Sequence, residues 1–176
     1  MSLGTPILEE PKTMVDFHNL YGKWVYYAHL PHDTDWSLDS YKKILKLESV
    51  EESIALVETL PEVLVKNCML FLMRENIKPL WEDENNRNGG CFSFKVHNKN
   101  VYKGWKNICY MLVGETLSQD KNLSNLINGV TISPKKNFCI IKIWLNNCNY
   151  QNINMINDIE ELDKKGVIFK KHKPEF

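Results

Sequence analysis

Short runs of β-branched and aromatic residues recur along most of this chain, and each run ends at residues that favour a turn. The runs expected to form strands are 23–28, 41–47, 68–73, 91–96, 130–145 with a break at 134–137, and 167–169. The stretches 82–90, which ends in a glycine pair, and 134–137 resemble hairpin connections. Strands joined in this way favour an antiparallel sheet.

Three other stretches predict helices. Ser49 and Glu52 form a capping box for a helix that runs to about Leu60, and two further helices are expected over 102–117 and 153–162. Their apolar stripes are Trp105, Ile108, Cys109 and Leu112, and Ile153, Ile156, Ile159 and Leu162, the second stripe followed by Gly166. The whole pattern predicts an α+β domain in which helices cover one face of a sheet and leave the other face free to bind.

Composition limits the domain count and the class of function. With 176 residues, 43% of them hydrophobic, we expect one domain over residues 18–176 after a flexible arm over residues 1–17. The 22 basic and 22 acidic residues cancel, which argues against non-specific coating of nucleic acid. Five cysteines without paired spacing predict neither disulfides nor a zinc site, and no apolar run could span a membrane. We therefore expect a cytoplasmic monomer without metal, cofactor or membrane contact.

Two tryptophans occupy expected loops. Trp81 follows a proline-fixed segment and precedes Glu82, while Trp36 lies in or just after the loop behind the first strand. Two electron-rich rings and a carboxylate suit a planar cationic base such as 7-methylguanine, because the ring faces attract the cation and the carboxylate pairs with its edge. The residues alone leave a second interpretation open, since tryptophans more often belong to a core than to a ligand platform.

The segment 77–90, together with five spaced tryptophans, resembles the eukaryotic translation initiation factor 4E family, which binds the messenger RNA cap. The resemblance extends over about residues 18–169 and rests on Trp24, Trp36, Trp81, Trp105 and Trp144. It implies a curved antiparallel sheet of about eight strands, backed by three helices on its convex face, with the cap in the concave slot. Trp24 and Trp105 are interpreted as core residues, because they lie in an aromatic strand and on a helical stripe.

The resemblance assigns base-binding roles by position. Trp36 and Trp81 match the two tryptophans that stack on the 7-methylguanine, and Glu82 matches the carboxylate that reads its edge. Trp144 matches the tryptophan that contacts the N7-methyl group, and Leu80 stands where a backbone group neighbours the base. Recognition of the base is therefore expected to be intact.

The positions expected to hold the cap phosphates depart from the family pattern. Lys135 is nearest to a phosphate-binding arginine of the family, and Lys136 lies beside it. The lysine that follows in the family corresponds to Ile140, and another family arginine corresponds to Cys91. Because a lysine lacks the two-pronged geometry of a guanidinium group, the resemblance predicts a weaker or rearranged phosphate grip.

Two further basic sites are candidates for RNA contact. Lys142 shares a strand face with Trp144, so it could compensate at the phosphates, although it could equally be a solvated strand lysine. The resemblance brings Lys170, Lys171 and His172 to the rim of the slot, where the later nucleotides of the RNA emerge. The alternative for these three is a frayed, charged tail.

The surface opposite the slot is where the family recruits a scaffold protein of the initiation factor 4G type, or repressors with the same short helix. The corresponding residues here are His18, Leu20, Val50, Ile54, Lys106 and Asn107. Ile54 stands in place of an anchoring tryptophan, and Lys106 stands where an apolar contact is expected. We expect a divergent or co-evolved scaffold partner, since such losses weaken a helix-in-groove interface.

The sequence therefore predicts a protein that binds capped messenger RNA in translation initiation and is not an enzyme. An alternative is a cap-binding competitor that represses or redirects translation, which the altered back surface also permits. A third hypothesis is a hydrolase of capped nucleotides that would use Glu82, Asp83 and Glu84 as metal ligands or general bases.

Overall fold

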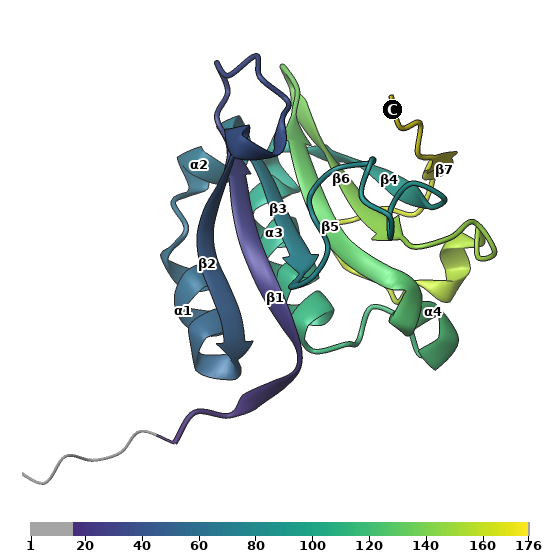
Figure 1. Cartoon of the computed structure of the whole chain (residues 1–176), viewed down its shortest axis with the longest axis horizontal. Helices are drawn as coiled ribbons and strands as arrows, with labels where there is room; N and C mark the ends of the chain where they lie inside the picture. Colours follow the sequence, from purple (N-terminus) through teal and green to yellow (C-terminus); the bar gives the residue numbers. More distant parts are fainter. Residues whose placement is uncertain (1–15, 176) are drawn as a thin grey trace, which may run out of the picture.

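The computed structural model describes residues 16–175, which form one curved antiparallel sheet with helices on one face (Figure 1). The strands lie in the order β2-β1-β3-β5-β6-β4-β7. Their bounds are β1 Asn19–His29, β2 Tyr41–Ser49, β3 Met69–Arg74, β4 Gly90–His97, β5 Ile127–Pro134, β6 Phe138–Leu145 and β7 Ile168–Lys171. The α+β class with a single antiparallel sheet is confirmed, with seven strands in the described residues where about eight were expected.

The helices are α1 Val50–Thr59, α2 Glu62–Asn67, α3 Asn98–Val113 and α4 Lys121–Leu126, with short 3-10 turns at Leu38–Ser40 and Ile153–Met155. The predicted capping box starts α1, because the Ser49 side chain accepts from the Glu52 amide while the Glu52 carboxylate accepts from the Ser49 amide. Helices α1, α2 and α3 pack against one another and against the sheet. None of the helices in residues 16–175 is long and apolar enough to cross a membrane.

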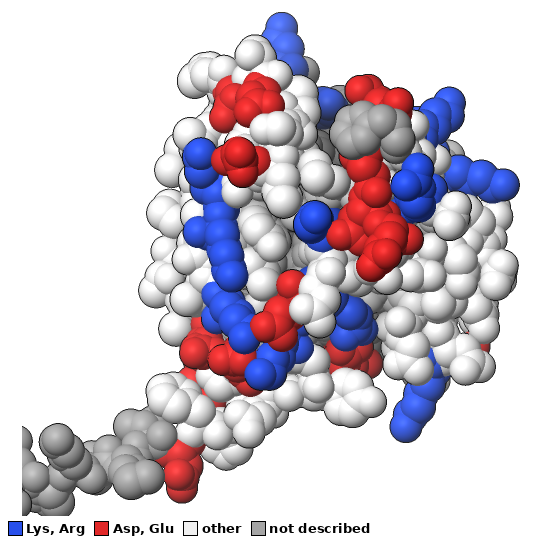
Figure 2. Space-filling view, in the orientation of Figure 1, with Lys and Arg blue, Asp and Glu red and all other residues white. Residues whose placement is uncertain are grey.

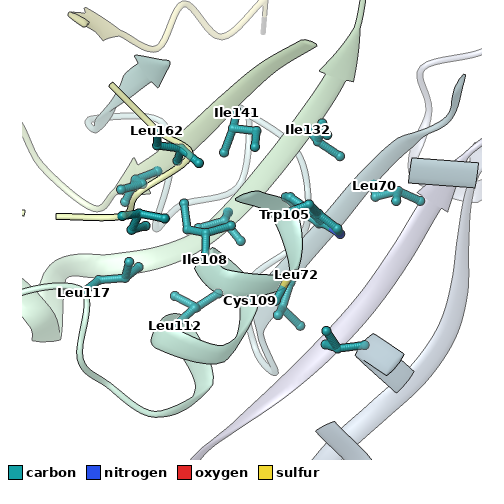
Figure 3. Packing of buried hydrophobic residues seen from close by; sticks show 14 of the residues in the cluster. Leu70, Leu72, Trp105, Ile108, Cys109, Leu112, Leu117, Ile132, Ile141 and Leu162 are labelled. Atoms are coloured by element: carbon teal, nitrogen blue, oxygen red, sulfur yellow. The ribbon is translucent and has the colours of Figure 1, made fainter. Parts of the chain in front are cut away.

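The main core fills the space between α3 and the sheet. Figure 3 shows Trp105, Ile108 and Leu112 of α3 among leucines and isoleucines of the strands. Trp24 and Trp105 are fully buried, which confirms their interpretation as core residues. The indole N–H of Trp105 donates to the hydroxyl of Tyr26 at 3.0 Å, so the polar atoms of both buried rings are satisfied.

The helix predicted over 153–162 is wrong. Only Ile153–Met155 forms a 3-10 turn, started by the side chain of Asn152, and Ile159 pairs with Leu162 in an isolated bridge. The apolar residues of the predicted stripe are nevertheless buried, because this irregular segment lies against α3, where Leu162 packs so close to Gly104 that a side chain there would collide. Burial of every third or fourth residue therefore does not require a helix.

The hairpin predicted over 82–90 is also wrong. The strands that this segment joins, β3 and β4, are separated in the sheet by β5 and β6, so residues 75–89 cross from one to the other over the open face. The predicted hairpin at 134–137 is confirmed, since β5 and β6 are neighbours and the Lys135 amide donates to the Phe138 carbonyl. The predicted arm over 1–17 lies almost wholly outside the described residues.

Candidate functional site

A pocket of about 780 Å³ opens on the sheet face that the helices leave uncovered. Its walls come from the segment after β1, from the 75–89 segment and from β3, β5 and β6. The lining residues are Trp36, Ser37, Leu38, Tyr41, Met69, Phe71, Pro79, Leu80, Trp81, Glu82, Thr131, Ser133, Lys142, Trp144 and Glu175. All five residues predicted to contact the base are among them. Figure 2 views this side, with a column of basic side chains over β2 and acidic side chains gathered over the 75–89 segment.

Trp36 projects from the segment between β1 and β2 and remains 54% exposed. Its indole lies flat on the imidazole of His29, with ring centroids 4.1 Å apart and planes 3° apart. The Asp35 carboxylate fixes the backbone after it by accepting from the amide and the hydroxyl of Ser37, both at 2.8 Å. The Ser37 amide and then its hydroxyl hold the pKa of Asp35 below its usual value. Trp36 is thus held by its neighbours although it is not buried.

Trp81 and Glu82 lie in a segment organised by two polar side chains. The Asp83 carboxylate accepts from the amides of Lys78 and Asn85, at 3.0 and 2.9 Å. The buried amide of Asn86 donates to the carbonyls of Lys78 and Leu80, at 2.9 and 2.8 Å. These bonds supplement the backbone hydrogen bonds of the turns in this segment. The Leu80 carbonyl accepts from the Asn86 side chain, and Leu80 itself lines the pocket.

Glu82 presents its carboxylate to the pocket. Its Oε1 accepts from the backbone amide of Glu175 at 3.1 Å, which brings the C-terminal segment to the pocket wall. Burial raises the pKa of Tyr41 to about 12, and the negative charge of Glu82 adds to this shift. Tyr41 and Glu82 therefore lie close together even though they come from opposite walls.

Trp144 forms part of the pocket floor and is only 4% exposed. Its indole N–H donates to the Thr131 hydroxyl at 3.1 Å, so the ring turns carbon atoms rather than a polar group to the pocket. Phe71 and Met69 of β3 extend the apolar floor beside it. An apolar substituent such as a methyl group would find a matching surface here.

Of the three lysines predicted to hold phosphates, only Lys142 lines the pocket. Its Nζ lies 5.9 Å from the ring centre of Trp81, and it shares a strand face with Trp144, as the alternation predicts. Lys135 and Lys136 are exposed in the β5–β6 turn. Cys91 pairs with Trp144 across β4 and β6, and burial raises the pKa of its thiol.

The three residues of the cluster at 170–172 lie in different environments. Lys170 and Lys171 are exposed on β7, which pairs with β4, so the frayed-tail alternative is wrong for them. The expectation that His172 lies at the rim is also wrong, because its backbone amide donates to the Gly89 carbonyl and its side chain is only 6% exposed. The imidazole lies instead beside Trp81 and Trp144.

The opposite surface carries the predicted partner residues. Val50 and Ile54 are exposed on α1, 39% and 48% respectively. Nearby, the Lys106 ammonium forms a 2.6 Å ion pair with Glu58, joining α3 to α1. The remaining positions have partners of other kinds. Asn107 donates to Glu161, the His18 ring bonds Glu51, and Leu20 packs against the core.

The carboxylates proposed for a hydrolase do not converge. Asp83 is occupied by backbone amides, and Glu84 is exposed outside the pocket lining, so Glu82 is the only one of these three carboxylates in the lining. Over residues 16–175, no three histidine, cysteine, aspartate or glutamate side chains gather in a way that could hold a metal ion.

Sequence reasoning missed several residues at the site. Among them are His29 and Tyr41, which lie at the adjoining ends of β1 and β2, Thr131 on the floor, and Glu175 at the wall. The alternation of side chains along a strand gave one usable signal, which concerns His29. His29 follows Tyr27 by two residues, so both side chains belong to the open face of the sheet. Nothing local marks Glu175.

Comparisons with known proteins agree on one family. The family model described as eukaryotic initiation factor 4E matches residues 19–175. The initiation factor 4E of Candida glabrata is 29% identical over 94% of this chain and 80% of that protein, and initiation factor 4E-2 of Schizosaccharomyces pombe is 27% identical over 95% of this chain and 66% of that protein. The structure of C. elegans eIF4E-3 with the 4E-binding protein Mextli and cap analog aligns with a TM-score of 0.72 at 21% identity, covering 92% of this chain and 99% of that one.

Proposed function

The chain belongs to the eukaryotic initiation factor 4E family, and from this premise we propose that it binds the 7-methylguanosine cap of messenger RNA in cytoplasmic translation initiation. The observation that carries the proposal is the meeting of Trp36, Trp81 and Glu82 in one pocket with Trp144 on its floor. A relative of the same fold was solved with a cap analog, which supports the ligand class.

The two tryptophans sandwich the methylated base. N7-methylation makes guanine a cation, and each stack of a desolvated cation on an indole contributes about 2 kcal/mol. The Glu82 carboxylate accepts the N1–H and the exocyclic amine of the base, and its charge complements the charge of the ring. A hydrogen bond to a charged group adds about 1.5–3 kcal/mol. Guanine offers the same N–H donors, so the preference for 7-methylguanine comes from the positive charge of its ring.

Trp144 receives the methyl group. Because its N–H is engaged by Thr131, its buried ring offers an apolar surface to the pocket. Leu80 supplies the backbone group that neighbours the base, since Leu80 lines the pocket.

The cap phosphates are held by lysines alone. Lys142 at the pocket is the first contact, and Lys135 and Lys136 supply charge from the β5–β6 turn. Each lysine acts as a point charge without a planar fork, so we expect a grip that depends strongly on salt. Lys170 and Lys171 on β7 are the candidates for contact with later nucleotides.

The back surface recruits a scaffold protein of the initiation factor 4G type that differs from the usual one. Val50 and Ile54 supply exposed apolar contact on α1, and the Lys106–Glu58 ion pair replaces apolar surface beside them. A partner helix must complement this ion pair. The alternative function, a competitor that binds caps without recruiting a scaffold, predicts that no scaffold protein co-purifies with the chain on cap resin from its own host.

We propose binding without catalysis. Of the carboxylates in the hydrolase hypothesis, only Glu82 faces the ligand. Incubation of 7-methyl-GTP with the protein and magnesium, followed by chromatography, should return the nucleotide intact, and steady turnover would favour the hydrolase instead.

The decisive measurement is a titration of tryptophan fluorescence with 7-methyl-GTP and with GTP. Trp36 and Trp81 should be quenched on stacking, and 7-methyl-GTP should bind at least tenfold more tightly, which corresponds to about 1.4 kcal/mol. Equal dissociation constants for the two nucleotides would refute cap recognition.

A further inference from the structure

Each of the two clamp tryptophans has a buried histidine against it. We propose that His29 and His172 are positioning residues, each fixing one indole plane by stacking on it while the pocket side of that indole receives the base. The proposal rests on the cap-binding function argued above. It adds two residues that contact the tryptophans and lie outside the pocket lining.

His29 is held from two sides before it holds Trp36. It ends β1, is 2% exposed, and meets Tyr41 of β2 edge-on at 5.2 Å. Its Nε2 lies 2.8 Å from the carbonyl of Asp35, and because a carbonyl only accepts, Nε2 carries the proton and donates. His29 thus binds the backbone immediately before Trp36 and the ring of Trp36 as well.

The stack leaves one face of Trp36 for a ligand. An indole has two faces, and the imidazole covers one of them at 4.1 Å with planes 3° apart. Trp36 lines the pocket whereas His29 does not, so the face turned from His29 is available to the base. Without the imidazole, a half-exposed indole on an irregular segment would sample several rotamers, and the base would have to select one of them.

His172 occupies the corresponding place behind Trp81. Its ring lies 13° from the plane of Trp81 in an offset stack with centroids 5.7 Å apart, and it leans on Trp144 at 4.8 Å. Its Nδ1 donates to the Asn86 carbonyl at 2.7 Å, while its buried Nε2 has no partner in the structure. His172 therefore joins Trp81, Trp144 and the 75–89 segment into one unit.

The charge state of the histidines matters because the ligand is a cation. Burial, together with the nearby Lys142 ammonium, lowers the pKa of His172 despite the bond to Asn86. The titratable neighbours of His29 are Asp35 and Tyr41. A neutral imidazole leaves the indole its electron density, whereas a protonated one would place a positive charge behind the ring and oppose a cationic base. Cap affinity should therefore fall as His172 protonates.

The first test compares His29→Ala, His29→Phe and the control His32→Ala, an exposed histidine of the same segment. Each is titrated with m7GpppG and with GpppG, and its melting temperature is measured to show that it is folded. We expect His29→Ala to weaken m7GpppG binding about five- to tenfold, or about 1–1.4 kcal/mol, since an aromatic stack is lost. His29→Phe should stay within about threefold of the wild type because it restores a flat ring.

An unchanged affinity in folded His29→Ala, or an equal loss in His32→Ala, would overturn the role of His29. Failure of the proposed function is a different result, namely a wild type that does not distinguish m7GpppG from GpppG. His172→Phe and His172→Ala are compared in the same way, and equal affinities of folded His172→Ala and the wild type would overturn the role of His172.

The second test separates positioning from mere structural support. The m7GpppG affinity of the wild type and of His172→Phe is measured between about pH 7.5 and about pH 5.5, the range in which histidines titrate. The titration of the ligand itself cancels in the ratio of wild type to variant. We expect the wild type to lose more affinity at low pH than His172→Phe, and parallel profiles would overturn the electrostatic part of the proposal.

Discussion

The backbone amide of Glu175 lies 3.1 Å from Oε1 of Glu82, so the C-terminal segment donates to the carboxylate that we propose to read the base. The 7-methylguanine offers N–H donors to the same carboxylate. The segment and the ligand therefore compete for part of one acceptor. Because Glu175 is exposed and lies in an irregular stretch after β7, the base should displace it.

Removing this amide should strengthen cap binding. Glu175→Pro eliminates the N–H, whereas the control Glu175→Ala keeps it and removes the same side chain. We expect Glu175→Pro to bind 7-methyl-GTP about two- to tenfold more tightly than Glu175→Ala in a fluorescence titration, since a hydrogen bond contributes about 0.5–1.5 kcal/mol. Equal dissociation constants for the two variants would mean that the contact does not compete with the base.

Removing the charge of Glu82 should weaken recognition of the base. Glu82→Gln keeps the size of the side chain but turns a charged acceptor into an amide, which costs about 1.5–3 kcal/mol, or about ten- to hundredfold in affinity for 7-methyl-GTP. Glu84→Gln, an exposed glutamate two residues later, is the matched control and should bind like the wild type. If both variants bind equally, Glu82 is only a loop residue.

Lys142 should act on the phosphates and not on the base. Lys142→Gln is expected to weaken the binding of 7-methyl-GTP about fivefold, or about 1 kcal/mol, because one partly screened charge contact is lost. Binding of 7-methylguanosine, which has no phosphate, should be nearly unchanged. Lys99→Gln, which alters an exposed lysine of α3 on the far face, controls for net charge. An equal loss for the nucleoside and the nucleotide would indicate that Lys142 supports Trp81 instead.

The pKa of His172 predicts a loss of stability in acid. Its pKa is lowered in the folded protein, so the unfolded chain binds the proton more readily. The stability contributed by neutral His172 is complete above the pKa of the unfolded histidine and is lost as the pH falls through the folded pKa. Urea denaturation at about pH 7.5 and about pH 5.5 should show a larger fall in the free energy of unfolding for the wild type than for His172→Phe. An equal fall in the free energy of unfolding of both proteins would contradict the lowered pKa of His172.

The regular part of the fold could be predicted because its signals are local. The capping box of Ser49 and Glu52 and the turn at 134–137 involve residues within a few positions of one another, and both are present in the structure. The segment 146–167 could not be predicted in the same way. Its shape comes from asparagine side chains that cap turns and from packing against α3, neither of which has a helical or strand period.

In the site, too, the residues with local sequence signals could be predicted and those with distant partners could not. The 77–90 segment carries Trp81 and Glu82 in a short recognisable stretch, whereas His172 reaches Asn86 across 86 positions of sequence. The alternation of side chains along β1 puts His29 on the open face of the sheet. It cannot predict that Trp36 stacks on His29, because that contact depends on the conformation of residues 30–40. Sequence reasoning named residues that line one pocket, missed His29, and placed His172 at the rim instead of beside Trp81.

On the back surface, Ile54 and Lys106 lie where we propose that a partner helix binds. Ile54→Trp combined with Lys106→Leu replaces a small anchor with an aromatic ring and removes the ion pair to Glu58. A generic scaffold peptide of the initiation factor 4G type should bind the double variant at least tenfold more tightly than the wild type, or about 1.4 kcal/mol, in isothermal titration calorimetry. Lys103→Leu, which removes the ion pairs of α3 with Glu160 and Glu161, is the control and should leave peptide affinity unchanged. Tight binding of the generic peptide to the wild type would show that Ile54 and Lys106 do not alter partner choice, because the two substitutions would then have nothing to restore.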